Sequence, residues 1–410
     1  MRAHIVHLLP TMMALAPMVL AQDPDLSKEV AALRARLDEL EEQQTKTAER
    51  LGSRAPVAAF SADAIDLGGH LSSFFTHMRG DGGDATGHLV SLFELFVKAQ
   101  VDEQWSVFAT PGFYLFNGAL LDNPATPQAG SDPAFTADDS TQVRTFLARL
   151  QAEWEPSDLL QVRGGIVGSP HGTTNREYFI PARQIAQASL HTRFFLGNQL
   201  YPQQVVGAAV AGRIPIGSSG NRIDYDAYFG SEPDSADDGI GGARLAYVWG
   251  ESGLSVAANY GRGTREVTSD PTTNFGVLQA PFPLGRFAAR DYEFVGLDVD
   301  WRLGSLIHKT EVYSSREEGF ADQFAASTET SWFVTPQWAV TYRFDYYDPG
   351  SDLSPLLSAV APQGHATEHV VGICFDPTDG VRLRLDGHHL RLPQSDETVE
   401  FYNFSWSVSF

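Results

Sequence analysis

The sequence predicts an all-β fold, a transmembrane up-and-down antiparallel β-barrel of about 16 strands, preceded by a short α-helical coiled coil. Two observations predict the barrel. Runs of roughly ten residues alternate apolar and polar side chains with a period of two. The links between these runs are rich in turn-forming residues and fall into short and long classes. Heptad spacing of apolar residues near the N-terminus predicts the coiled coil.

Residues 1–21 have the organisation of a signal peptide. Arg2 supplies a positive charge, an apolar stretch without acidic residues runs from Ile5 to Leu20, and the small-x-small pattern ends at Ala21. A membrane anchor is the alternative, but the stretch is short and two prolines interrupt it. We therefore expect the chain to be exported, with residue 22 as the start of the mature protein.

Composition narrows the class of the exported chain of 410 residues. Its single cysteine, Cys374, excludes an intramolecular disulfide. A net charge of −22 argues against binding to nucleic acid or to anionic lipid surfaces. No later segment reaches the roughly 18 apolar residues of a spanning helix. No metal-ligand spacing, phosphate loop or nucleotide fingerprint stands out, so neither a metal nor a cofactor is expected.

Residues 22–52 predict a coiled-coil helix in the periplasm. Apolar residues alternate at spacings of four and three, and the segment Arg36–Glu41 resembles the Arg-apolar-x-x-apolar-Glu pattern of trimeric coiled coils. About four heptads are too short to be stable alone, which favours a homotrimer over a lone amphipathic helix or spacer. The expected oligomerisation residues are Leu33, Arg36, Leu37, Leu40 and Glu41.

Residues 53–64, rich in Ala, Ser and Pro, predict a linker, and residues 65–410 predict the barrel. Fourteen or eighteen strands remain open, because a hairpin is easily gained or lost at this stage. The candidate strands begin near Ile65, Leu89, Ser106, Val143, Leu159, Val205, Arg222, Ala243, Leu254, Tyr292, Leu306, Phe324, Trp338, Glu368, Val381 and Glu400.

The final strand shows the two faces most clearly. One side carries asparagine and serines, which would line the lumen, and the other is apolar and would face lipid. Charges on one face of most strands would be costly in a packed sandwich core, whereas a wet lumen tolerates them. Tryptophans near strand ends suit interfacial girdles. The apolar set, which we also predict to be the assembly signal, is Tyr402, Phe404, Trp406, Val408 and Phe410.

The segment Leu160–Gly172, followed by Asn175 and Glu177, resembles the strand and Gly-x-x-x-x-Pro-x-Gly entry to the third loop of bacterial outer-membrane porins related to the phosphate-selective O/P group. A terminal strand ending in Phe410 likewise resembles the signal read by the barrel-assembly machinery. The resemblance implies a channel for passive diffusion of ions and small hydrophilic solutes, located in the bacterial outer membrane with its lipid and lipopolysaccharide. It does not carry phosphate selectivity, because this chain is acidic and has few lysines.

The long segment 168–202 is the best candidate for a loop folded into the lumen as a constriction; a solvated surface loop is the alternative. Strand alternation places further charges on the lumen face, including Arg222, Arg244, Lys309, Glu94, Asp224, Asp226, Asp298, Asp300 and Glu311. The pore-lining and constriction candidates are Arg149, Glu153, Arg163, Arg176, Glu177, Arg183, Arg193, Arg343, Asp345, Arg382, Arg384 and Asp386.

Two questions about these charges stay open. Opposed rows of the two signs would create a transverse field, whereas pairs between neighbouring strands would merely brace the barrel. Acidic loops such as 232–238 favour a weak preference for cations.

Two other functions compete with a pore. An enzyme is disfavoured because no nucleophile motif accompanies the adjacent His388 and His389. A tether between outer membrane and cell wall through the coiled coil could coexist with a pore.

Overall fold

The computed structural model describes residues 65–80, 83–117, 141–176, 183–185, 189, 191, 200–231, 239–250, 252–265, 290–318, 322–348, 365–392 and 397–410. The predicted signal peptide, coiled coil and linker therefore lie outside the described residues. Within the described part of the chain, no helix has the length and apolar character needed to cross a membrane.

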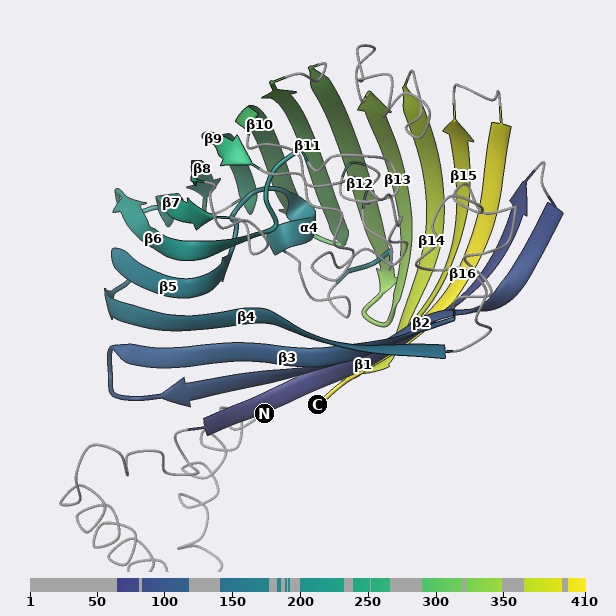
Figure 1. Cartoon of the computed structure of the whole chain (residues 1–410), viewed down its shortest axis with the longest axis horizontal. Helices are drawn as coiled ribbons and strands as arrows, with labels where there is room; N and C mark the ends of the chain where they lie inside the picture. Colours follow the sequence, from purple (N-terminus) through teal and green to yellow (C-terminus); the bar gives the residue numbers. More distant parts are fainter. Residues whose placement is uncertain are drawn as a thin grey trace, which may run out of the picture. The chain divides into compact units, whose positions relative to one another are not determined.

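Sixteen antiparallel strands close into one barrel, in which each strand pairs with its neighbours in sequence and β1 pairs with β16 (Figure 1). A four-residue helix, α4 (Thr173–Arg176), lies in the segment between β5 and β6. The strands are β1 Ile65–Gly80, β2 Gly83–Gln100, β3 Trp105–Asn117, β4 Thr141–Ser157, β5 Leu160–Gly168, β6 Gln204–Ile216, β7 Asn221–Ser231, β8 Ile240–Trp249, β9 Leu254–Arg265, β10 Arg290–Leu303, β11 Leu306–Glu317, β12 Gln323–Thr335, β13 Trp338–Asp348, β14 Ala366–Thr378, β15 Val381–Leu392 and β16 Glu397–Ser409.

The predicted strand count and order are confirmed, and most strands begin within three residues of the expected position. The largest difference is β2, which begins at Gly83 rather than near Leu89 because its pairing with β1 continues to Gly80. Every link at one end of the barrel holds two to four residues, as expected. The links at the other end are not uniformly long, since 81–82, 318–322 and 393–396 are also short. We call the first end the short-turn end and the second the loop end.

The period of two sorts side chains between the two faces of the wall. On β13, Tyr342 is 44% exposed on the outer face, whereas Thr341 and Asp345 on the inner face are 1% and 0% exposed. On β16, Phe404 is 44% exposed and Ser405 is buried. The apolar side therefore faces outward and the polar side faces the lumen, which is the reverse of a soluble β-sandwich.

All seven tryptophans lie within three residues of a strand end at the short-turn end. Five of them, including Trp105 and Trp338, have large exposed fractions on the outer surface. Indole rings prefer the boundary between headgroups and hydrocarbon. This row therefore marks one membrane interface, and it identifies the level at which the short turns emerge.

The C-terminal residue, Phe410, pairs with Gly69 of β1 at the seam where the barrel closes. Phe410 and Gly69 exchange two backbone hydrogen bonds of 3.1 Å, and the Phe410 ring stacks beside Phe93 at 6.3 Å. A Cβ atom on Gly69 would lie 2.7 Å from the Phe410 ring and 2.7 Å from the carbonyl oxygen of Glu94. A glycine is therefore required at this position for the terminal phenylalanine to reach β1.

We expect Gly69→Ala to destabilise the barrel by about 1–3 kcal/mol, because the added methyl group meets backbone and ring atoms that cannot both move away. Gly241→Ala is the matched control, since a Cβ atom there has its nearest neighbour at 3.5 Å. Urea unfolding in lipid vesicles, followed by tryptophan fluorescence, measures both. Equal unfolding midpoints for the two variants would contradict the proposed closure.

Candidate functional site

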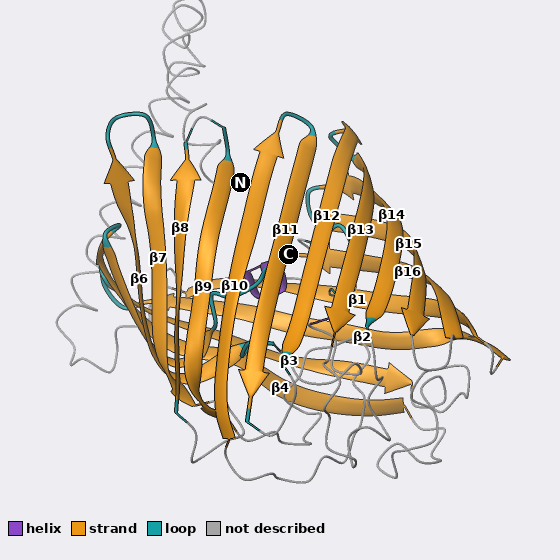
Figure 2. Cartoon of the chain, turned by 90° about the horizontal axis from the view of Figure 1, so that it is seen from above, coloured by secondary structure: helices purple, strands orange, loops and turns teal. Residues whose placement is uncertain are grey.

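The described residues of the segment between β5 and β6 lie in the lumen. Figure 2 shows α4 enclosed by the strands. The described parts of this segment contact inward-facing side chains of β10, β11 and β15, strands well separated from β5 and β6 in the wall. We call residues 169–203 the inward loop. The described residues of this loop contact the inner wall, whereas its role as a constriction stays a prediction.

The two ends of the inward loop are held together at the wall. The Ser169 amide donates to the Gln203 carbonyl at 3.0 Å, which continues the β5–β6 ladder by one step. Gly172 then turns the chain inward with φ = 71°, a conformation that glycine adopts without strain. A side chain on Gly172 would also collide with the hydroxyl of Tyr201, only 1.8 Å from the Cβ position.

A buried ring cluster anchors the base of the loop. His171 meets Phe294 of β10 edge-on at 4.6 Å between ring centroids, and Tyr201 contacts Tyr313 of β11 at 4.5 Å. His171 also hydrogen-bonds through one ring nitrogen to Asn259 at 3.0 Å, and through the other to a tyrosine hydroxyl of β7 at 3.1 Å. The loop base is thus fixed by both apolar contact and polar pairing.

The strongest electrostatic link joins α4 to β10. Arg176 binds the Asp298 carboxylate at 3.1 Å and the Asp300 carboxylate at 2.5 Å. Asp298 is fully buried and also accepts hydrogen bonds from Arg244 at 2.7 and 3.1 Å and from Asn259 at 2.7 Å. One wall carboxylate therefore pairs with a loop arginine and a wall arginine at the same time.

A second carboxylate receives donors from the loop at a different place. Glu311 accepts from the Thr173 amide at 2.7 Å and lies 3.2 Å from His191 and 3.5 Å from the Ser189 hydroxyl. The wall also donates to the loop backbone. The Arg183 carbonyl accepts hydrogen bonds from the side chains of Arg382 at 3.3 Å and Arg384 at 3.0 Å. Together with the link to Asp298, these contacts attach the loop to β10, β11 and β15.

Burial and neighbouring charges shift the pKa values of His171 and Arg176 in the inward loop. Burial lowers the pKa of His171 to about 4, with a smaller lowering from Arg244 that hydrogen bonding by Asn259 and the charge of Asp298 oppose. For Arg176, burial by itself lowers the pKa, but Asp298 and Asp300 outweigh it and raise the pKa above its ordinary value. At neutral pH the loop therefore presents a neutral His171 and a charged Arg176.

The wall is not equally open around its circumference. The inner side chains of β13 are buried, whereas Arg222 and Asp224 on the inner face of β7 are 40% and 27% exposed. The loop contacts lie on β10, β11 and β15. The inner face of β7 near the short-turn end is therefore more accessible than the inner face of β13.

The structure places the described members of the predicted pore-lining set on the inner side of the wall or in the inward loop, and their role in the pore stays a prediction. Arg176 and Arg183 lie in the inward loop and touch the wall, whereas Glu177 and Arg193 fall outside the described residues. The Arg149 guanidinium lies against Gly168, where the loop begins. The wall members are Arg149 and Glu153 on β4, Arg163 on β5, Arg343 and Asp345 on β13, and Arg382, Arg384 and Asp386 on β15.

These wall charges pair locally rather than forming two opposed rows. Arg163 binds Asp226 across the intervening β6, and Arg343 binds Asp345 of its own strand at 2.9 Å. On β15, Arg382 forms a bidentate pair with an aspartate of β14 at 2.6 and 2.7 Å. Of the two arrangements left open by the sequence, the described contacts favour bracing between nearby strands.

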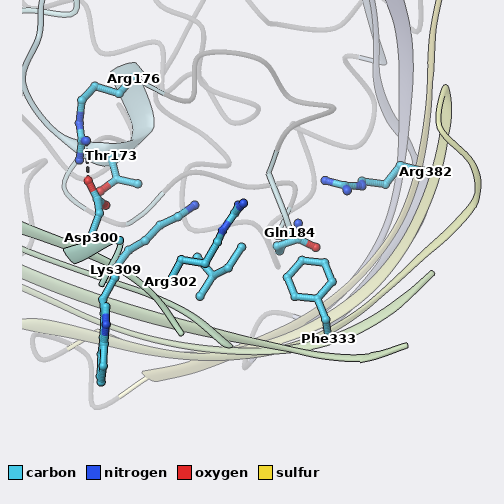
Figure 3. Close-up of a pocket in the computed structure, with 11 residues that line it drawn as sticks. Thr173, Arg176, Gln184, Asp300, Arg302, Lys309, Phe333 and Arg382 are labelled. Atoms are coloured by element: carbon cyan, nitrogen blue, oxygen red, sulfur yellow. Dashed lines mark hydrogen bonds and ion pairs between the residues drawn. The ribbon is translucent and has the colours of Figure 1, made fainter. Parts of the chain in front are cut away.

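Sequence reasoning missed several members of this site. His171 was part of a motif but had no assigned role, because its partners Asn259 and Tyr228 are distant in sequence. Arg302 of β10 lines a cavity together with Arg176 (Figure 3) and carried a usable signal, since it follows the inward-facing Asp300 by two residues. Among the described residues, no group of three or more His, Cys, Asp or Glu side chains is arranged to hold a metal ion.

No protein-family model matches the chain. No curated protein matches it either. Solved structures do match. Pseudomonas putida OprB superposes with a TM-score of 0.58 at 8% identity, covering 85% of this chain and 95% of OprB. An anion-selective porin from Comamonas acidovorans gives 0.55 at 12% identity, covering 84% and 99%.

The barrel has the porin fold. Vibrio cholerae OmpT in its trimer form is also similar, with a TM-score of 0.50 at 12% identity over 84% of this chain and 99% of OmpT. At these identities the similarity concerns the fold. The inward loop and its contacts are therefore argued from this porin-fold barrel alone.

The depressed pKa of His171 makes the loop base sensitive to acid. Between pH 6.5 and 4 the unfolded chain binds a proton at His171 that the folded chain does not, so stability falls as the pH drops through this range. We expect a loss of up to about 3 kcal/mol from this group. Unfolding of wild type and His171→Gln at pH 7 and pH 4 measures it. The variant should lose less stability on acidification, and an equal loss in both proteins would refute the assignment.

Proposed function

We propose that this protein is an outer-membrane porin that forms a water-filled channel for passive diffusion of ions and small hydrophilic solutes. One observation carries the proposal: described residues of the inward loop dock on the inner wall of a closed 16-stranded barrel. Barrels of about this strand number leave an aqueous channel, whereas eight strands are filled by their own side chains. A channel with a fixed constriction selects solutes by width and charge and needs no chemical step.

The apolar outer face and the tryptophan row support a location in the bacterial outer membrane, in contact with lipid and lipopolysaccharide. The outward side chains of β16 and the closing role of Phe410 support recognition of this strand by the barrel-assembly machinery. The Gly-x-x-x-x-Pro-x-Gly entry to the inward loop supports a relation to the O/P group of porins. That the chain is not an enzyme stays a prediction.

The domain organisation completes the proposal. A signal peptide (1–21) directs export, a periplasmic coiled coil (22–52) joins three chains, and a linker (53–64) leads into the barrel (65–410). The heptads with Arg36 and Glu41 support a homotrimer. Each barrel in such a trimer is a separate channel.

Removing the inward loop should widen the channel. Since Ser169 already pairs with Gln203, an Asn-Gly turn can replace residues 170–202 and continue the hairpin between β5 and β6. We expect single-channel conductance in planar bilayers to rise severalfold, because the docked loop no longer occupies the lumen. A matched control replaces residues 266–289, the long link between β9 and β10, with the same turn. Wild-type conductance in the loop-replaced protein would contradict the constriction, and the absence of any channel in wild type would contradict the pore.

The coiled coil should set the oligomeric state. Deleting residues 25–51 removes the predicted heptads and leaves the barrel sequence unchanged. We expect the deletion variant to shift from trimer to smaller species in light scattering of detergent-purified protein, while single-channel conductance per barrel stays at the wild-type value. A trimer that survives the deletion unchanged would show that the barrels associate without the helix.

A further inference from the structure

Buried polar side chains join four strands across the seam where the barrel closes. On β15, His388 lies between two carboxylates, 2.9 Å from Glu368 of β14 and 2.6 Å from Asp386 of its own strand. Asn403 of β16 donates to the same Asp386 oxygen at 2.9 Å and accepts a hydrogen bond from Thr76 of β1 at 2.7 Å. All five residues are at most 3% exposed. We call them the seam clamp.

The strand register fixes the position of the seam clamp. Asp386, Asn403 and Thr76 are direct partners across β15, β16 and β1, so they form one row through the seam. This row lies toward the loop end of β1, whereas the pairing of Phe410 with Gly69 lies toward its short-turn end. The clamp therefore adds side-chain hydrogen bonds to a part of the seam that the terminal phenylalanine does not reach.

The two contacts of the His388 ring need one proton more than a neutral imidazole supplies. An ionised carboxylate only accepts hydrogen bonds, and a neutral imidazole donates from one nitrogen only. A neutral ring that donates to Glu368 would place a nitrogen lone pair 2.6 Å from an oxygen of Asp386, where two acceptors repel. The Asn403 amide is 3.1 Å from this nitrogen, but a bond from it would not separate the nitrogen from the carboxylate. A further proton therefore lies between His388 and Asp386, whichever of the two atoms it is bonded to.

Other charged groups reach the clamp from β13 and β12. Arg343 approaches Glu368 at 3.5 Å, binds Asp345 of its own strand at 2.9 Å and lies 3.9 Å from Glu329. From β16, the Phe401 ring stacks on the clamp histidine at 4.1 Å between centroids and brings no charge. Breaking a buried ion pair by removing the charge of one partner is strongly unfavourable. The clamp therefore needs its proton to stay intact.

We propose that the seam clamp makes closure of the barrel depend on a proton. Closing the seam brings His388 between its two carboxylates, and it takes up a proton wherever a free imidazole is neutral, which is above about pH 6.5. The stability that the clamp contributes is then present in neutral solution and is lost as the pH rises. This inference concerns closure of the barrel and does not depend on the proposed pore function.

Urea unfolding of the full-length protein in lipid vesicles at pH 7.5 and pH 9.5, followed by tryptophan fluorescence, tests the proposal. A closed barrel that holds one proton more than the unfolded chain loses up to tenfold in its folding equilibrium constant per pH unit. We therefore expect the wild type to lose up to about 100-fold between the two conditions. His388→Gln should be less stable than the wild type at pH 7.5 and should lose much less on going to pH 9.5. Because the other titrating groups are common to both proteins, the difference isolates the clamp.

His389→Gln is the matched control, because the neighbouring His389 is exposed and its ring lies 3.7 Å from Glu400, outside the clamp. This control should show the wild-type loss. Asp386→Asn is a second clamp variant that keeps the shape of the side chain. Its amide can donate to a neutral His388, so its loss at pH 9.5 should also be small.

Two results would overturn the proposal. One is a wild-type stability that is the same at pH 7.5 and pH 9.5, and the other is an equal loss in the wild type and in both clamp variants. Channel currents do not enter the measurement. A protein that forms no channel would therefore contradict the proposed function while leaving this test intact.

Discussion

The position of the inward loop depends on the buried carboxylate of Asp298. An isolated ion removed from water is unfavourable by several kcal/mol, so Asp298 is stable only with its partners in place. Arg244 and Asn259 supply two of them from the wall, and Arg176 supplies the third from the loop at 3.1 Å. Displacing the loop would remove one of the three partners of this buried charge. The inward loop is therefore held by the same carboxylate that binds Arg244 of the wall.

The remaining contacts restrict the loop to one orientation. Ring packing around His171 and Tyr201 is tolerant of rotation, but the hydrogen bonds to Glu311 and to the Arg183 carbonyl have defined directions. These attachments lie on β10, β11 and β15 and enter from different sides of the loop. Arg176 is thereby held against β10, so its charge has a fixed place in the lumen.

Much of the barrel could be predicted from the sequence, because lipid outside and polar groups inside impose a strict period of two, and turns such as Leu303–Leu306 are short and distinctive. The partners of the inward-facing charges could not be predicted from the sequence, because they depend on which inward positions face each other across neighbouring strands. Arg163 and Asp226 meet over β6, and His171 reaches Asn259 across 88 residues. The glycine requirement at Gly69 arises only once Phe410 is in place.

The net charge of the whole chain and the charge near the inward loop are separate quantities, because screening limits the range over which each charge acts. At physiological salt a charge acts on a passing ion over about 8 Å, so most of the acidic excess has no influence on an ion inside the narrow zone. Only the charges within that distance decide which sign is favoured there. At the level of the inward loop these include Arg176 and the carboxylates of Asp298, Asp300 and Glu311, which bind the loop. Net charge is therefore a poor guide to the field inside the barrel, which is set by the residues that the strand alternation turns inward.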